Sequence, residues 1–160
     1  MPNPIKEAIL GRGWAGKTIT RAETVERLNP LLRQFLTLNH YYQSAIRSHS
    51  DRAVTEALQR VQKTARADVG KLSESILSAG GTPENGTDLE PDDFTLADDD
   101  LEMLTELEDL ETDFREALTH ERQEVEHQMR TRGILEALKS NSTERLELLR
   151  DLIEREQSTP

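Results

Sequence analysis

Apolar residues recur at helical spacing in two long segments of the first half of the chain. The first begins with a capping box, because Thr20 stands three residues before Glu23 in "TRAE". Its apolar stripe comprises Leu28, Leu31, Leu32, Phe35, Leu38, Tyr42 and Ile46. The second stripe comprises Val54, Leu58, Val61, Ala65, Val69, Leu72, Ile76 and Ala79. These patterns predict helices over about residues 21–48 and 51–80, the second ended by Gly80, Gly81 and Pro83.

The second half repeats the pattern after an acidic, Pro- and Gly-containing stretch, which we interpret as a loop over residues 81–97. A third helix is expected over about residues 98–131 or longer, on the stripe Leu104, Leu107, Phe114, Leu118 and Val125. "SNST" at 140–143 is interpreted as a turn with a cap. A short fourth helix is then expected over about 143–157, on the stripe Leu146, Leu149, Leu152 and Ile153.

The fold class predicted from these elements is an all-α four-helix bundle over residues 20–160. No stretch of the chain shows the alternation of a half-buried strand. Each of the first two helices would be roughly 45 Å long, and the loop reaches ~53 Å when extended. The loop is therefore long enough to cross the bundle and make the second and third helices parallel, although an up-down-up-down bundle also fits.

Residues 1–19 are expected to form a flexible basic arm that contains a phosphate-loop-like motif. "GRGWAGKT" (11–18) fits G-x-x-x-x-G-K-[ST], which binds nucleotide phosphates only where a strand precedes it and a helix follows. The only candidate strand, "IKEAIL" (5–10), has no predicted partner strand. We therefore interpret the match as accidental, and expect Trp14 to anchor the arm on the bundle or on a second subunit.

Composition narrows the classes of partner. The 160 residues include no cysteine, which excludes disulfides and thiolate metal sites. The net charge of −11 disfavours nucleic acid as a partner. Residues 1–21 nevertheless carry four basic residues against one acidic residue, a net charge of +3. No apolar run is long enough to span a membrane, and we expect a cytoplasmic protein.

Three segments resemble the bacterioferritin-type proteins of the ferritin-like superfamily. "LNPLLRQFLTLNHYYQSAI" (28–46) resembles their first helix, and "ARADVGKLSESILSAGGTP" (65–83) resembles the second with its Gly-Gly-x-Pro ending. "LLRDLIERE" (148–156) resembles the start of their final helix. The resemblance covers about residues 25–156, much of it apolar patterning, and implies a ferritin-like bundle with a long crossover loop.

The resemblance also implies that the di-iron ligands are largely lost. That family needs a Glu from two helices and Glu-x-x-His from the other two. The corresponding positions hold Phe35 in the first helix, Ala65 and Asp68 in the second, Glu111 in the third, and Glu156 and Thr159 in the fourth. A standard ferroxidase centre cannot be assembled from this set, because both histidines and two of the glutamates are missing.

Polar residues nevertheless fall on the inward faces of the predicted helices. They are Asn39 and Tyr42, with His49 at the helix end, then Asp68, Glu111, Glu121 and Glu156. A buried carboxylate must be paired, protonated or metal-bound. Two interpretations stay open: a polar network of Asn39, Tyr42, Asp68 and Glu121, or a metal site that includes Asp68, Glu111 and Glu156, with iron or manganese as candidates.

A second candidate metal site lies in "QEVEHQM" (123–129), which contains Glu124 and His127 at Glu-x-x-His spacing. This stretch resembles encapsulated ferritins, a family that builds its metal site across a subunit interface. On the helical wheel His127 points away from the apolar stripe, which indicates a solvated histidine in a monomer. Two copies of the motif could bind metal in a dimer.

Two functions follow from these observations. The loss of ligands favours a non-enzymatic module that oligomerises, as a dimer or larger, or docks to a protein partner. The resemblance favours the alternative, a metal-binding or oxidative-stress protein of ferritin type with an atypical carboxylate or inter-subunit site. Self-association is also expected because Trp14, Leu36 and Tyr41 lie off the apolar stripes.

Overall fold

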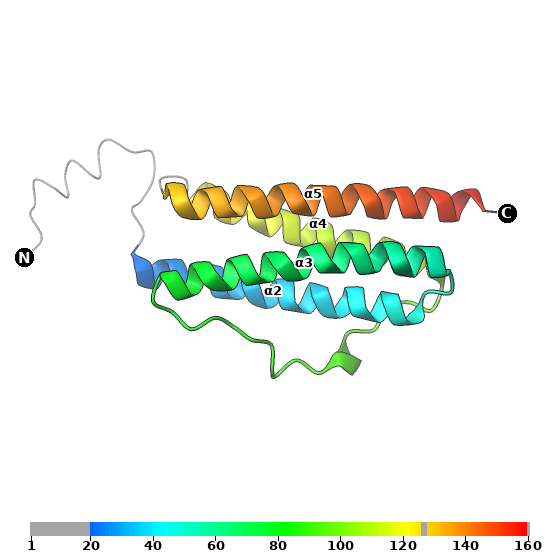
Figure 1. Cartoon of the computed structure of the whole chain (residues 1–160), viewed down its shortest axis with the longest axis horizontal. Coiled ribbons are helices and arrows are strands. Elements are labelled where there is room, and N and C mark those ends of the chain that lie inside the picture. The colour runs from blue at the N-terminus through cyan, green and yellow to red at the C-terminus, as the bar shows by residue number, and fades with distance from the viewer. Residues whose placement is uncertain (1–19, 126–127, 160) are drawn as a thin grey trace, which may run out of the picture.

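The computed structural model describes residues 20–125 and 128–159, and most of them are helical (Figure 1). The elements are α2 (Arg21–Ser48), α3 (Arg52–Ser78), the short 3₁₀ helix η1 (Pro91–Asp93), α4 (Asp100–Glu124) and α5 (Met129–Ser158). The described residues contain no strand. The predicted all-α four-helix bundle is therefore confirmed. The phosphate-loop-like motif, Trp14 and the rest of residues 1–19 lie outside the described residues.

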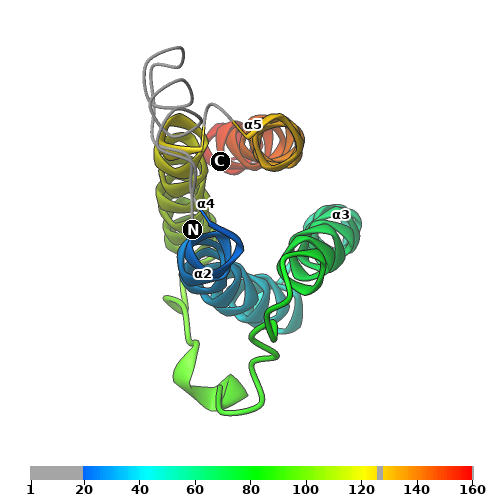
Figure 2. The same ribbon diagram turned by 90° about the vertical axis from the view of Figure 1, so that its left-hand side faces the viewer.

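The four helices form two antiparallel hairpins joined by one long crossover. Helices α2 and α3 run in opposite directions, as do α4 and α5, whereas α3 and α4 run the same way (Figure 1). In cross-section α2 packs against α3 and α4, and α5 packs against α4 and α3 (Figure 2). The chain thus takes the crossover arrangement, which ferritin-like folds also have, rather than up-down-up-down.

The boundary between the last two helices differs from the prediction. Helix α4 ends at Glu124 rather than near residue 131, and α5 begins at Met129 rather than near residue 143. The "SNST" stretch lies inside α5. Its side chains have partners on other helices, because Ser142 donates to Glu111 and Arg115 donates to the Thr143 hydroxyl. Such tertiary bonds satisfy groups that would otherwise compete with the helical backbone.

Short-range signals fix the other helix ends. The side chains of Thr20, Asp51 and Asp99 accept backbone N–H bonds as the N-caps of α2, α3 and α4. After α3, Gly80 adopts a φ of +85°, a conformation that side chains disfavour. A Cβ at Gly81 would lie 2.5 Å from the Val25 side chain, so the chain passes close to α2 there.

The crossover segment lies along α2 and is bound to it at several points. Arg33 donates two hydrogen bonds to Asp88, at 3.2 and 2.7 Å, and the Asn29 side chain bonds the loop backbone. Phe94 stacks on His40 at a centroid distance of 4.9 Å and meets Tyr41 edge-on at 5.4 Å. The apolar surface that Tyr41 presents off the main stripe is therefore covered by the chain's own loop.

The core fills the space between the four helices. Its largest fully buried side chains are Tyr42, Phe35, Phe114, Leu28, Leu32, Leu58, Leu72, Ile76, Met103, Leu104, Leu107 and Leu118. None of the described helices has the length and apolar character needed to cross a membrane. Charged side chains are buried near the middle of this apolar interior, and they form the candidate site.

Candidate functional site

A buried arginine occupies the middle of the bundle. Arg145 lies on α5, on the same stripe as Leu138, Ser142 and Leu149, and only 3% of it is exposed. Because α5 packs between α3 and α4, a long side chain from this stripe can reach carboxylates on both neighbours. Asp68 and Glu111 provide those carboxylates, from α3 and α4 respectively.

Glu111 is the most completely bonded member of the cluster. Its Oε1 accepts from Arg145 Nε at 2.5 Å and from the Tyr42 hydroxyl at 2.7 Å. Its Oε2 accepts from the Ser142 hydroxyl at 2.8 Å and from Arg145 Nη2 at 3.4 Å. Four donors from α2 and α5 thus surround one carboxylate, and each of its oxygens is shared by two of them.

Asp68 is bound on the other side of the guanidinium. Its Oδ2 accepts from Arg145 Nη1 at 2.9 Å, and its Oδ1 accepts from the Asn141 amide at 2.9 Å. Lys71, one helical turn away, lies 3.6 Å from Oδ1 and keeps 54% of its side chain exposed. Asp68 therefore links the buried core to the polar surface between α3 and α5.

An aromatic ring lies against the guanidinium of Arg145. Arg145 lies over the ring of Phe35, 5.3 Å from its centroid, which is a cation–π distance. Phe35 in turn stacks on Phe114 at 4.2 Å. Phe35 therefore packs against both the guanidinium and a second aromatic ring.

The cluster is balanced in charge. Asp68 and Glu111 contribute two negative charges, and Arg145 and the rim residue Lys71 contribute two positive ones. Burial tends to lower the pKa of Arg145, but the charge of Glu111 and its hydrogen bonds outweigh burial and raise that pKa above its ordinary value. Burial, followed by the charge of Glu111, raises the pKa of Tyr42 well above 10, so its hydroxyl stays a donor.

Two residues predicted for the polar network lie apart from it. Asn39 donates to the Phe35 carbonyl of its own helix at 3.0 Å, and its Oδ1 is buried without a partner. Glu121 lies ten residues beyond Glu111, about 15 Å along α4, and its Oε2 is 3.7 Å from Arg27. The network prediction is thus corrected: Tyr42 and Asp68 belong to it, whereas Asn39 and Glu121 do not.

The predicted metal residues are divided among three places. Asp68 and Glu111 share Arg145, whereas Glu156 lies at one end of the bundle. Glu124 lies near the opposite end of α4, 3.6 Å from Arg27, with 44% of its side chain exposed. His127 lies outside the described residues, so the Glu-x-x-His site stays a prediction.

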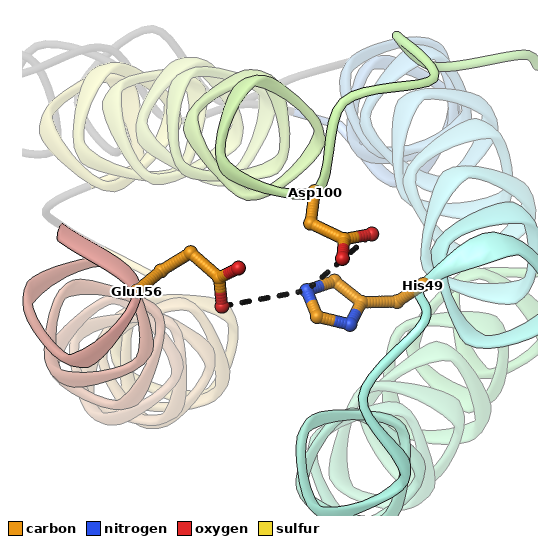
Figure 3. Close-up of side chains that lie close together, drawn as sticks. All are labelled: His49, Asp100 and Glu156. Carbon is orange, nitrogen blue, oxygen red and sulfur yellow. Dashed lines mark ion pairs between the residues drawn. The ribbon is translucent and has the colours of Figure 1, made fainter. Parts of the chain in front are cut away.

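Glu156 belongs to a second cluster at the end of the bundle (Figure 3). There His49, the C-cap of α2, meets Asp100 from the first turn of α4 and Glu156 from the last turns of α5. The His49 Nε2 atom is 3.9 Å from a carboxylate oxygen of each acid. The ligand atoms of the three side chains all lie within 4.8 Å of one another.

Sequence reasoning missed Arg145 and Ser142, although the signal for them was present. Residues 135, 138, 142, 145, 149 and 152 follow one another at spacings of three and four, which is one continuous helical stripe. Interpreting "SNST" as a turn interrupted that stripe and removed Ser142 from it. Arg145 fell inside the predicted fourth helix but was not assigned to its apolar stripe. Asp100 was missed because only folding brings the start of α4 to the end of α2.

The central cluster supplies its own counter-charge and hydrogen-bond donors. Both carboxylates already accept protein donors on both oxygens, and a protein cation lies between them.

No model of a known protein family matches this chain, and a search of the curated proteins finds no match. The geometry of the site itself must therefore indicate the function.

Proposed function

We propose that this chain is a non-catalytic, ferritin-like helical module that works through its outer surface, by associating with a second copy of itself. The observation that carries this proposal is the position of Arg145 between Asp68 and Glu111. A ferritin-type reaction needs carboxylates with free lone pairs directed at a metal. Here Arg145 supplies the positive charge that a metal would otherwise provide. Unlike a metal ion, its guanidinium cannot be exchanged for another ligand and cannot change oxidation state.

The ferritin-like part of the proposal is supported by topology. One long crossover joins two antiparallel hairpins, and a Gly-Gly-x-Pro sequence ends α3, as the resemblance implies. The inward positions of α3 and α4 still carry acids, at Asp68 and Glu111. A bundle that lost its metal ligands and gained an arginine would keep such acids because the arginine needs partners.

The associating surface that we propose lies between the end of α3 and the start of α5. Among the described residues, the exposed large hydrophobic side chains are Leu77, 60% exposed, and Met129, 75% exposed. Both line a groove of about 660 Å³ together with Ile134. Exposed apolar side chains gathered at one groove favour a protein partner.

Charge at the groove favours a second copy as that partner. The lining includes one acid, Glu74, and two bases, Lys71 and Arg130. In a two-fold arrangement the same patch meets itself, so Glu74 of one copy can face Arg130 of the other. The remaining surface is strongly acidic on average, with a net charge of −11 for the chain, and would oppose other pairings of like molecules.

Light scattering over a wide range of concentration tests the association. We expect the mass of a dimer or larger for the full chain, and a shift toward monomer for Leu77→Glu because a charge replaces apolar contact. Gln59→Glu is the matched control, since it adds the same charge to an exposed position of α3 that does not line this groove. A monomer at all concentrations would contradict the proposal, as would an assembly that Leu77→Glu leaves intact.

An iron(II) oxidation assay tests the chemical half of the proposal. We expect oxidation no faster than in buffer, because the carboxylates of the core are bonded to Arg145. Oxidation that is faster than in buffer, and is lost in Glu111→Gln, would show that the core does bind reactive iron.

A further inference from the structure

The geometry points to a divalent-metal site at the end of the bundle, formed by His49, Asp100 and Glu156 and separate from the arginine-centred core. The ion would be a first-row metal that accepts both imidazole nitrogen and carboxylate oxygen, with Zn²⁺ as the representative case. Its role would be structural. It would join the end of α2 to the start of α4 and the end of α5 (Figure 3).

The histidine gives the first reason. The His49 side chain is fully buried, and its Nε2 atom has no hydrogen-bond partner. That atom is directed between the two carboxylates, 3.9 Å from each, which is too far for a direct hydrogen bond (Figure 3). A buried polar atom without a partner is rare in folded proteins, and one that faces two acids calls for an occupant between them.

The distances fit such an ion. Zinc binds imidazole nitrogen and carboxylate oxygen at about 2.0–2.2 Å, so two ligands on one ion stand roughly 3.3–4.2 Å apart, depending on the angle between them. The two Nε2–oxygen distances of 3.9 Å fall inside this range. Because the ligand atoms all lie within 4.8 Å of one another, small side-chain rotations are enough to close the third pair.

The carboxylates of Asp100 and Glu156 differ in how firmly the protein holds them. Asp100 is fixed in place by the backbone N–H of Ser50, at 3.2 Å, and by the Ser50 hydroxyl. Both bonds favour the ionised form that a metal requires. Glu156 has no side-chain hydrogen bond from the described residues, and its side chain is 26% exposed. The site therefore has one rigid and one adjustable carboxylate, and both are partly exposed, at 23% for Asp100 and 26% for Glu156.

One feature weakens the site. The backbone N–H of Asp51 donates to His49 Nδ1 at 3.0 Å, which places the proton of a neutral ring on Nε2. Metal binding at Nε2 moves that proton to Nδ1, so the Asp51 N–H must turn toward solvent. In most protein sites the second ring nitrogen already donates to an acceptor. We therefore expect an affinity below that of sites preorganised in this way.

Thermal unfolding of the full chain with Zn²⁺ alone tests the site. At a Zn²⁺ concentration about a hundredfold above the dissociation constant, we expect the melting temperature to rise by about 5–10 °C. The rise should be lost in Glu156→Gln and in His49→Gln. Glu154→Gln is the matched control, because it makes the same change at an exposed position two residues away on α5 and should keep the full rise. Mg²⁺ should have little effect, since it disfavours imidazole.

If Zn²⁺ does not raise the melting temperature of the parent chain, the inference is overturned. A rise that survives in both Glu156→Gln and His49→Gln would also overturn it, since the ion would then bind elsewhere. X-ray absorption of the zinc-loaded chain gives a second measurement that does not depend on stability. We expect one imidazole with oxygen ligands, and a spectrum without imidazole would contradict the site.

Discussion

The two acidic clusters of this bundle are built from similar side chains but satisfied in different ways. In the core, Asp68 and Glu111 are paired by Arg145, and every polar atom of these three side chains has a partner. At the end of the bundle, Asp100 and Glu156 face a histidine whose Nε2 atom has none. Carboxylates at inward positions therefore do not by themselves indicate a metal, because the nearest cation determines what they bind.

Burial explains the difference between the clusters. A charge enclosed on all sides by helices has no access to water, so the protein must supply its counter-charge. Arg145 can do so because its planar group binds two carboxylates at once. At the end of the bundle Glu156 still reaches solvent, and part of the compensation is left to water or to a bound ion.

The largest expected effect comes from removing the cation of the core. Arg145→Met leaves Asp68 and Glu111 buried without their partner, and we expect a loss of about 3–5 kcal/mol in the free energy of unfolding. Urea denaturation measures it. The control is Arg150→Met, since Arg150 pairs with Glu108 at the surface and should contribute no more than about 1 kcal/mol. Equal effects of the two changes would contradict the central role of Arg145.

A smaller loss is expected when one carboxylate of the core is removed. Asp68→Leu leaves Arg145 bound to Glu111, so only part of the compensation disappears. We expect a loss of about 2–3 kcal/mol, the scale of hydrogen bonds to charged groups. Combining Asp68→Leu with Arg145→Met should cost less than the sum of the two, because both remove the same ion pair. Strict additivity in this double-mutant cycle would show that the pair does not contribute as a unit.

The Tyr42 hydroxyl should make stability depend on pH in the alkaline range. Its folded pKa lies above the unfolded value near 10. The stabilisation is therefore complete below pH 10 and is lost as the pH rises through the folded pKa. At pH 7 we expect Tyr42→Phe to cost about 1–2 kcal/mol by removing the bond to Glu111. The difference from the parent should shrink as the pH rises above 10.

Denaturation at a series of pH values, with Tyr41→Phe as the matched control, measures this effect. Tyr41 lies outside the core network, against Phe94. If the alkaline loss of stability persists unchanged in Tyr42→Phe, a titrating group other than Tyr42 causes that loss.

The smallest effect is expected for a change of Asp100 at the end of the bundle, measured in the absence of added metal. The hydrogen bond from the Ser50 side chain holds the pKa of Asp100 below its ordinary value, against the opposing effect of burial. The stabilisation is complete above the unfolded pKa near 4 and is lost as the pH falls through the folded pKa. Asp100→Asn should therefore reduce stability at pH 7 by less than about 1 kcal/mol.

The acid range distinguishes Asp100 from its neighbours. The difference between the parent and Asp100→Asn should shrink as the pH falls from the unfolded pKa of Asp100 through its lower folded pKa, as measured by acid-range denaturation. Asp98→Asn, at an exposed neighbouring position, serves as the control. A difference that stays constant down to the lowest pH would show that the charge of Asp100 is not what stabilises this end.

Local sequence was sufficient for the first two helices and insufficient for the last two. Helix α2 matches its predicted span, and α3 lies within one or two residues of it, because caps, an apolar stripe and terminal glycines agree there. Helix α5 begins fourteen residues earlier than predicted, at Met129 rather than residue 143. Ser142 and Thr143 favour a turn when considered alone. Within the helix their hydroxyls are bonded to Glu111 and Arg115 of α4, and that of Thr143 also donates to the Lys139 carbonyl.

The sequence alone determined that the chain is an all-α bundle, where its long loop falls, and that acids stand at inward positions on α3 and α4. These features depend on periodicity and on short-range capping, which any helix of this sequence would share. Only the tertiary structure decided what the acids bind. Asp68, Glu111 and Arg145 lie far apart in sequence, and so do His49, Asp100 and Glu156. Their pairing depends on which helices become neighbours, and packing of the whole bundle sets that.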